Sequence, residues 1–254
     1  MKIGIVGFGH VGKLMKKTFP ESLIFDPFLK LGLKEEINIC DVAFVCVPTD
    51  MLENGDCDTS IVEECINWIK SELIIIRSTV PVGFTDKMVE KYKKRIVFQP
   101  EYYGETQDHP FNNTSRDWLS FGGEPSSVNL AIKAYQLITN SEVKIFQSNA
   151  ADVEMAKYME NSFLATKVTF VNEMFDIAQG LGVDFNKTRE IWLADPRIGR
   201  SHTFIYEEKR GFSGKCLPKD ISSIKNQAAN VKVDTLLLDT IVEKNDYFLN
   251  KNKK

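Results

Sequence analysis

The sequence has none of the features that would place the chain in a membrane or outside a cell. No apolar run approaches the roughly 20 residues that a helix needs to span a bilayer. The first residues, Met1-Lys2-Ile3-Gly4-Ile5, lack the charged, apolar and small-residue regions of a signal peptide and predict a strand instead. We therefore expect a cytoplasmic protein with no membrane partner.

Metal-ligand and disulfide patterns are also missing. The five cysteines contain no CxxC pair, and the three histidines lie far apart in the chain. A disulfide framework is not expected in a chain of this size without a secretion signal. The sequence thus predicts reduced cysteines and no metal site.

Charge of one sign is not in excess. The 32 basic and 35 acidic residues give a net charge of −3, so nothing favours nucleic acid as a partner. The hydrophobic share of 43% and the charged share of 26% are typical of a soluble globular protein. A length of 254 residues allows one large domain or two modest ones.

Short apolar runs alternate with helix-length segments in the first part of the chain. The run at residues 42–47 is apolar on both faces, as a strand buried beneath helices requires. This alternation predicts an α/β fold with a doubly wound parallel sheet of the Rossmann type. The predicted strands cover residues 2–6, 23–25, 42–47, 73–77, 96–98, 118–121 and 143–146, with helices at 61–70, 85–94 and 127–138.

The strand pattern stops near residue 149. Between Asn149 and Gly180 there is no proline or glycine, and apolar residues recur at helical spacing. A helix of this length predicts packing against an extended partner such as a second subunit. Shorter helices are predicted at 187–193, 218–229 and 233–249. We therefore expect an α/β domain over residues 1–148, an all-α domain over 149–254 with a long connecting helix, and a homodimer through the helical domain.

A glycine-rich turn follows the first predicted strand. In Gly7-Phe8-Gly9-His10-Val11-Gly12 the glycines suit a tight turn, close approach to a pyrophosphate and close helix packing. Asp26 ends the second strand about twenty residues on, where a carboxylate accepts from a ribose 2′-hydroxyl and repels a 2′-phosphate. This favours NAD over NADP. The alternative for Asp26 is a turn residue before Pro27, and Lys30 lies close enough to soften the exclusion of NADP.

A cysteine lies in a glycine-rich segment near the C-terminus, Gly211-Phe212-Ser213-Gly214-Lys215-Cys216-Leu217-Pro218-Lys219-Asp220. Pro218 suits the first position of a helix, so Cys216 would lie at a helix N-terminus, where the dipole favours the thiolate. The alternatives are that Cys216 is a small buried residue and that Asp220 is a helix-capping carboxylate in the first turn.

This segment resembles the GFGGxCxPKD motif of the UDP-glucose and GDP-mannose dehydrogenase family. Further resemblances follow in the same order: Val47-Pro48-Thr49 to its VPT, residues 78–83 to its STVPVG, and residues 100–105 to its PEFLxE. Lys157 and Asn161 match the lysine and asparagine of its long helix, residues 195–199 resemble its DxRIG, and residues 245–247 resemble the end of its central region. The match spans nearly the whole chain.

The resemblance implies NAD-dependent oxidation of a nucleotide-sugar C6 alcohol to a carboxylate, UDP-glucose to UDP-glucuronate being the expected reaction. Cys216 would attack the aldehyde from the first hydride transfer, and a second transfer would give a thioester that water hydrolyses. Lys157 and Asn161, four residues apart on one helix, would stabilise the oxyanion. Glu101 would act as acid or base, while Thr79 and Asp220 would hold the water and support the cysteine.

The resemblance also implies binding positions. Arg197 would reach the site of a neighbouring subunit in a dimer, the alternative being an exposed loop arginine. The expected NAD contacts are Gly7, Phe8, Gly9, His10, Val11, Gly12, Asp26, Lys30, Val47, Pro48, Thr49, Thr79 and Glu105. The expected substrate contacts are Glu101, Tyr102, Tyr103, Lys157, Asn161, Arg197, Phe204, Gly211 and Cys216.

The sequence departs from the family pattern in several places. Ser213 and Thr106 replace glycines, and the loop at residues 200–210 is longer than usual. Family members carry a third domain that grips the nucleotide half of the substrate, and this sequence ends at Lys254, where that domain would begin. We therefore expect weaker binding or a different substrate. Two alternatives stay open: a two-electron hydroxyacid dehydrogenase that uses Lys157, and a non-catalytic NAD-binding protein left after domain loss.

Overall fold

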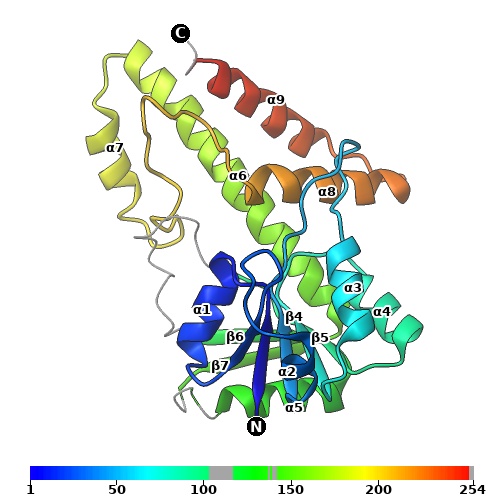
Figure 1. Ribbon diagram of the computed structural model, residues 1–254. Helices are drawn as coiled ribbons and strands as arrows, with labels where there is room; N and C mark the ends of the chain where they lie inside the picture. Colours follow the sequence, from blue (N-terminus) through cyan, green and yellow to red (C-terminus); the bar gives the residue numbers. More distant parts are fainter. Residues whose placement is uncertain (103–116, 137, 139–141, 252–254) are drawn as a thin grey trace. The chain divides into compact units, whose positions relative to one another are not determined.

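The computed structural model describes residues 1–102, 117–136, 138 and 142–251. The chain forms two compact units, Met1–Lys157 and Tyr158–Lys254, which we call the sheet unit and the helical unit. Figure 1 shows the strands within the first and the helices of the second. The predicted α/β fold followed by helices is confirmed, and the domain boundary predicted after residue 148 stays a prediction.

The sheet unit contains a seven-stranded sheet with the order β2-β1-β3-β4-β5-β6-β7. Strands β1 to β5 run parallel, and β7 is parallel to β6. The β5–β6 pair is antiparallel and is joined at Phe98 and Gly122, a departure from a wholly parallel sheet. The strands are β1 (Ile3–Val6), β2 (Leu23–Phe25), β3 (Val42–Val45), β4 (Leu73–Ile76), β5 (Ile96–Phe98), β6 (Trp118–Gly122) and β7 (Lys144–Ser148).

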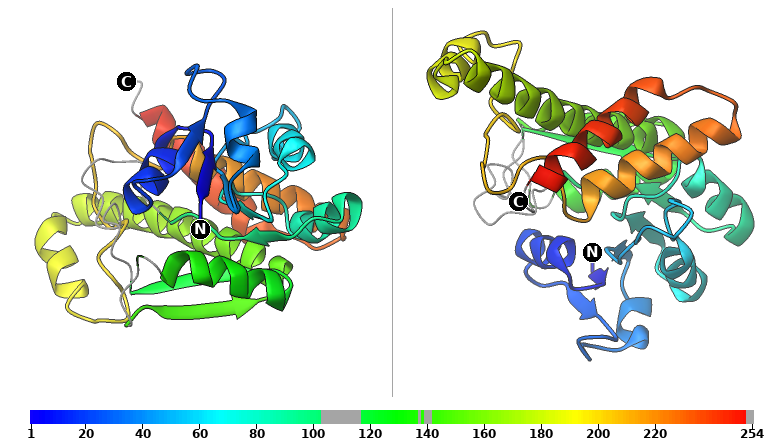
Figure 2. Two further views of the ribbon diagram at one scale, coloured as in Figure 1. Left: turned by 60° about the horizontal axis from the view of Figure 1, so that its bottom comes forward. Right: turned by 90° about the horizontal axis from the view of Figure 1, so that it is seen from above.

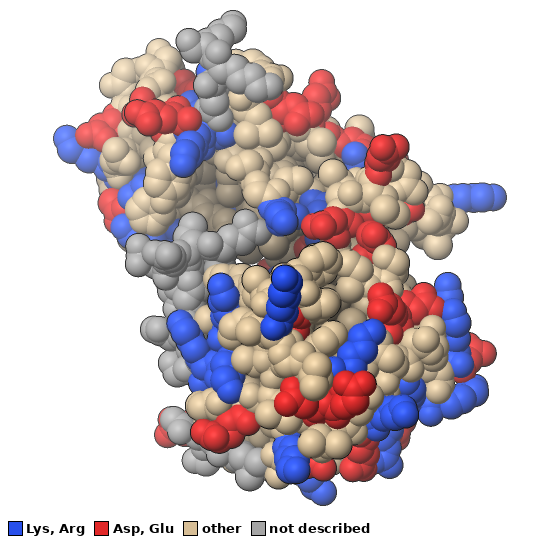
Figure 3. All heavy atoms as spheres, in the orientation of Figure 1, with Lys and Arg blue, Asp and Glu red and all other residues tan. Residues whose placement is uncertain are grey.

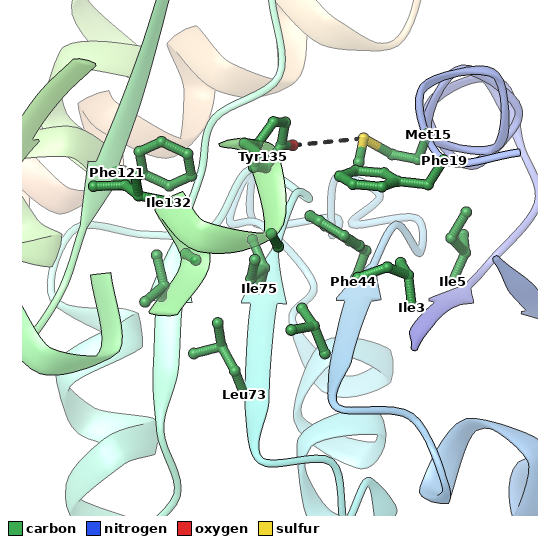
Figure 4. Packing of buried hydrophobic residues seen from close by; sticks show 14 of the residues in the cluster. Ile3, Ile5, Met15, Phe19, Phe44, Leu73, Ile75, Phe121, Ile132 and Tyr135 are labelled. Atoms are coloured by element: carbon green, nitrogen blue, oxygen red, sulfur yellow. Dashed lines mark hydrogen bonds between the residues drawn. The ribbon is translucent and has the colours of Figure 1, made fainter. Parts of the chain in front are cut away.

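Helices cover both faces of this sheet. On one face, α1 (His10–Thr18) and α5 (Pro125–Gln136) pack against alternate strand residues such as Phe44 and Ile75. Figure 4 shows this packing, with the Tyr135 hydroxyl 4.0 Å from the Met15 sulfur. The other face is covered by α2 (Lys34–Asn38), α3 (Ser60–Trp68), α4 (Phe84–Tyr92) and the start of α6 (Ala150–Gly180). Apolar residues on both faces of β1, β3, β4 and β5 therefore account for the unbroken apolar runs in the sequence.

The helical unit contains the rest of α6 with α7 (Phe185–Trp192), α8 (Cys216–Asn230) and α9 (Leu236–Lys251). Its small core joins Ala165 of α6, Ile221 of α8 and Ile241 of α9 with the loop residue Phe212. Figure 2 shows α8 and α9 lying side by side. Helix α8 begins two residues before the predicted start, which makes Pro218 its third residue.

The surface of the sheet unit carries both signs of charge. On the face shown in Figure 3, its acidic and basic side chains are interspersed. None of the helices in the described part of the chain is long and apolar enough to cross a membrane.

A buried carboxylate links two helices of the sheet unit. Glu154 of α6 is fully buried and accepts hydrogen bonds from the Gly83 and Thr85 amides, at 2.6 and 3.0 Å, and from the Thr85 hydroxyl at 2.6 Å. It therefore caps the N-terminus of α4. Burial raises the pKa of Glu154, because desolvation outweighs these bonds. Because the pKa of Glu154 is higher in the folded than in the unfolded chain, its titration adds to the free energy of unfolding at low pH. This contribution is complete below the ordinary carboxyl pKa and is lost as the pH rises through the raised pKa.

Replacing this carboxylate tests its structural role. Glu154→Ala leaves three donors without their acceptor and is expected to lower the free energy of unfolding by about 3 kcal/mol. Urea denaturation at neutral pH measures the change. The matched control is Glu173→Ala on the same helix, where an exposed ion pair with Lys244 is expected to contribute less than about 1 kcal/mol. Equal losses in the two variants would contradict the assignment.

Candidate active site

The glycine turn has the geometry of a phosphate-binding loop. Gly7 has a φ of +87°, and a Cβ there would lie 2.6 Å from the Cys46 carbonyl oxygen. A Cβ on Gly12 would lie 2.0 Å from the Gly7 carbonyl oxygen, whereas one on Gly9 would meet nothing within 4 Å. The first and third glycines therefore serve packing, while the second leaves open backbone at the start of α1, as approach to a pyrophosphate requires.

Asp26 connects the end of β2 to this turn. One oxygen of its buried carboxylate accepts from the Phe8 amide at 2.7 Å, and the other accepts from the Phe28 and Leu29 amides at 2.9 and 3.0 Å. Asp26 is therefore a turn residue, one of the alternatives from the sequence, and it also lies beside the glycine turn as ribose recognition requires. Lys30 lies exposed in the same turn with a φ of +54°. The cofactor contacts of both residues stay predictions.

The loops that follow β3 and β4 are joined by side chains that the sequence analysis missed. The Ser78 hydroxyl donates to the Val47 carbonyl at 2.6 Å. The Cys57 thiol donates to the Thr79 carbonyl at 3.4 Å and lies 3.8 Å from the Thr49 carbonyl. Because parallel strands end at one edge of the sheet, these bonds hold the predicted cofactor contacts Val47, Thr49 and Thr79 together at that edge. Pro48 lies between the first two.

Glu101, the predicted acid or base, has a buried cationic partner. Its carboxylate lies 2.5 Å from the guanidinium of Arg77, and the two side chains are 11% and 5% exposed. Arg77 follows β4 directly, and Glu101 lies three residues after β5. Arg77 was not predicted as a site residue, since its pairing joins residues 24 positions apart. The ion pair therefore fixes the position of the Glu101 carboxylate at the end of β5.

Lys157 is buried, so the alternative of a solvated lysine is wrong. Its ammonium lies 4.7 Å from the centre of the Tyr102 ring, a cation–π distance. Tyr102 in turn packs edge-on against Trp118. Two other predicted contacts, Tyr103 and Glu105, lie outside the described residues.

In the helical unit, Cys216 is the first residue of α8 and is exposed. Asp220, one turn further along, is 1% exposed and accepts from the Asn161 amide at 2.5 Å. It also pairs with the Lys219 ammonium at 2.9 Å. The alternatives of a buried Cys216 and of a first-turn capping role for Asp220 are therefore wrong. The early start of α8 makes Asp220 its fifth residue and turns it toward α6.

The loop after α7 contains the predicted substrate contacts Arg197 and Phe204. Arg197 is 85% exposed and pairs with Asp195 at 2.5 Å, as expected for a loop arginine in a single chain. The Phe204 ring lies 4.2 Å from the guanidinium carbon of Arg189. Lys167, which the sequence analysis did not assign, donates to the Ile198 and Gly199 carbonyls at 3.0 and 2.6 Å.

The predicted residues thus lie in two groups joined by one helix. The sheet unit carries the glycine turn, Asp26, Thr79, Glu101 and Lys157, and the helical unit carries Asn161, Cys216 and Asp220. Lys157 and Asn161 lie one turn apart on α6 and so share a face. Among the described residues, no three His, Cys, Asp or Glu side chains are grouped to hold a metal ion.

Sequence profiles of two consecutive domains match the chain. The NAD binding domain of the UDP-glucose/GDP-mannose dehydrogenase family matches residues 28–109, and the central domain of that family matches residues 151–247. UDP-glucose 6-dehydrogenase of Rickettsia prowazekii is 29% identical over 258 residues, which cover 92% of this chain and 58% of the relative. TuaD of Bacillus subtilis, a UDP-glucose 6-dehydrogenase, is 29% identical over 83% of this chain and 47% of its own length. The chain therefore spans about half the length of these relatives.

Solved structures show the same fold. A UDP-glucose dehydrogenase from Pyrobaculum islandicum superimposes with a TM-score of 0.83 at 20% identity, covering 97% of this chain and 68% of that one. A 3-hydroxyisobutyrate dehydrogenase from Mycobacterium tuberculosis gives a TM-score of 0.71 at 18% identity, covering 95% of this chain and 91% of that one. At these identities the likeness establishes the fold alone.

The cysteines are expected to differ sharply in reactivity. Burial raises the pKa of the Cys46 and Cys65 thiols to about 12, and Cys40 and Cys57 are buried as well. Iodoacetamide at neutral pH should therefore modify Cys216 first, as mapped by peptide mass spectrometry. The protein unfolded in urea, in which all five thiols should react, is the control. Modification of Cys46 before Cys216 would contradict the described geometry.

Proposed function

Because the chain belongs to the UDP-glucose/GDP-mannose dehydrogenase family, we propose that it oxidises the C6 alcohol of a nucleotide sugar to a carboxylate, UDP-glucose being the favoured substrate. The cofactor is NAD. One observation supports this proposal above the others: an exposed Cys216 at the start of α8, one turn from a buried Asp220 that is bonded to Asn161. A nucleophile supported in this way suits covalent catalysis.

The described residues fit NAD. The open backbone at Gly9 and the start of α1 would hold the pyrophosphate, and Asp26 would accept from a ribose hydroxyl. The loops after β3 and β4, with Val47, Thr49 and Thr79, would contact the rest of the cofactor. When bound, NAD supplies the hydride acceptor for each of the two oxidations.

Glu101 begins the reaction as a base. Its carboxylate accepts the proton of the C6 hydroxyl while the carbon loses a hydride, which leaves an aldehyde. The buried Arg77 guanidinium, which is ion-paired with this carboxylate, would hold it in position during the reaction. The exposed Cys216 thiol then loses its proton to solvent, its sulfur forms a bond to the aldehyde carbon, and the carbonyl π electrons move to the oxygen.

The oxyanion formed in this way needs donors. The Lys157 ammonium and the Asn161 amide lie on one face of α6, and Asp220 orients the amide. The loss of one such donor typically costs about 3 kcal/mol of transition-state stabilisation. Loss of a second hydride leaves a thioester on Cys216, and water held by Thr79 adds to its carbon and releases the thiol and the carboxylate product.

The stoichiometry of NADH tests this scheme. Purified protein is mixed with UDP-, GDP- and free sugars, and absorbance should show two NADH for each substrate oxidised. Cys216→Ala should give at most one, because the second oxidation needs the thiohemiacetal. A yield of one NADH per substrate oxidised in the wild type would contradict the four-electron scheme. Steady turnover of Cys216→Ala on hydroxyacids would support a two-electron dehydrogenase, and NAD binding without NADH from any sugar would support a non-catalytic protein.

We also propose that the chain forms a homodimer through the helical unit and acts in the cytoplasm, where its five cysteines stay as thiols. The support for the dimer is a row of exposed apolar side chains along one side of α6. Met159 and Phe163 are 62% and 63% exposed, and Phe170, Met174 and Ile177 are between 40% and 49% exposed. Their spacing of three, four and seven residues places them on one face, which a second copy would cover.

Charges on this face should separate the subunits. Phe163→Asp combined with Phe170→Asp buries two carboxylates in the proposed interface, so sedimentation velocity should show a monomer where the wild type is a dimer. The control is Lys187→Asp, because Lys187 lies on α7 with an 84% exposed side chain. A monomeric wild type at micromolar concentration would rule out the proposed dimer.

A further inference from the structure

The segment that leads to Cys216 is held by a single asparagine of α9. The Asn245 side chain is 4% exposed, its oxygen accepts from the Phe212 amide at 2.6 Å, and its nitrogen donates to the Phe212 carbonyl at 2.9 Å. One amide thus satisfies both backbone groups of one residue. Neither a carboxylate nor a longer amide at position 245 can repeat this pair of bonds in the same space.

The residue before Phe212 is a glycine for steric reasons. Gly211 has a φ of +79°, and a Cβ there would lie 2.6 Å from the Asn245 side-chain oxygen. The Phe212 ring is buried with Ala165, Ile221 and Ile241. Asn245 can therefore approach the chain closely only because Gly211 has no side chain, and this approach fixes Phe212 in the core of the helical unit.

The next residue upstream is anchored to α6. The buried Arg210 guanidinium donates to the Asn172 side-chain oxygen at 2.6 Å and to the Asp176 carboxylate at 2.9 Å. Its guanidinium carbon also lies 4.8 Å from the centre of the Phe175 ring and 5.1 Å from the centre of the Phe248 ring. Residues 210–212 thus have fixed positions on two helices.

Cys216 follows this anchored segment by four residues. Gly214, with a φ of +86°, turns the chain between Phe212 and the start of α8. On the other side of Cys216, Asp220 is bonded to Asn161. The exposed cysteine therefore has a fixed point on each side, four residues away in both directions.

We propose that Asn245 is a positioning residue that holds Cys216 where it captures the aldehyde formed in the first oxidation, an inference that rests on the proposed function. The first hydride transfer does not use the sulfur, whereas the second does. Loosening of residues 211–216 should therefore impair the second oxidation more than the first. A loss of folded protein would instead lower both oxidations together and leave their ratio unchanged.

The test uses Asn245→Ala and Asn245→Asp, with Glu243→Ala on the exposed side of the same helix as the matched control. NADH formed per UDP-glucose consumed should fall from two toward one in both Asn245 variants. Reactions quenched into methoxyamine should contain the oxime of a C6 aldehyde. We expect kcat for the complete oxidation to fall about tenfold or more, and the KM for NAD to stay within about twofold. The control variant should match the wild type.

Hydrogen exchange provides a readout that needs no substrate. The peptide that contains residues 211–216 should exchange faster in the Asn245 variants than in the wild type. Asn245→Ala removes both side-chain bonds to Phe212, and Asn245→Asp removes the bond to its carbonyl. If Asn245→Ala does not fold, Asn245→Asp, which keeps an acceptor for that amide, decides the question.

Two results would overturn the inference. One is unchanged hydrogen exchange in the peptide of residues 211–216, and the other is faster exchange while the yield stays at two NADH per UDP-glucose consumed. A wild type that forms no NADH from any nucleotide sugar would instead refute the proposed function. In that case the exchange data alone decide whether Asn245 holds the segment.

Discussion

Buried polar side chains distributed along α6 are the constraint on which the structure depends most. Glu154 caps α4, Asn161 bonds to Asp220, Lys167 holds the loop at residues 198–199, and Asn172 accepts from Arg210. Burying any of these polar groups without its hydrogen-bond partner would lower the free energy of unfolding. Because the partners come from segments far apart in the chain, satisfying them places those segments along one helix.

The same helix helps to explain why one cysteine of five is exposed. Cys40, Cys46, Cys57 and Cys65 lie within the sheet unit and are buried, where desolvation keeps a thiol neutral. Cys216 lies at the exposed start of α8, and α6 and α9 hold its flanks through Asn161 and Asn245. The exposure of a thiol therefore depends on its position in the fold and not on the residue type alone.

Residues that the sequence analysis missed share one property. Arg77, Cys57, Lys167 and Asn245 each have a partner that lies between 22 and 33 positions away in the chain. No local spacing rule links such positions, because their distance is set by the packing of separate elements. The environment of Asp220 could not be predicted from local spacing either, because its burial against Asn161 depends on the residue at which α8 begins.

The order of strands and helices, the glycine turn and the cysteine segment were determined by the sequence itself, through apolar periodicity and the conformational needs of glycine and proline. Element boundaries departed by a few residues, as at α8 and α9, where capping and packing compete. Only the tertiary structure decided the antiparallel β5–β6 pair, the Arg77–Glu101 ion pair and the hold of Asn245 on Phe212. Each of these joins groups whose separation along the chain carries no information about their separation in space.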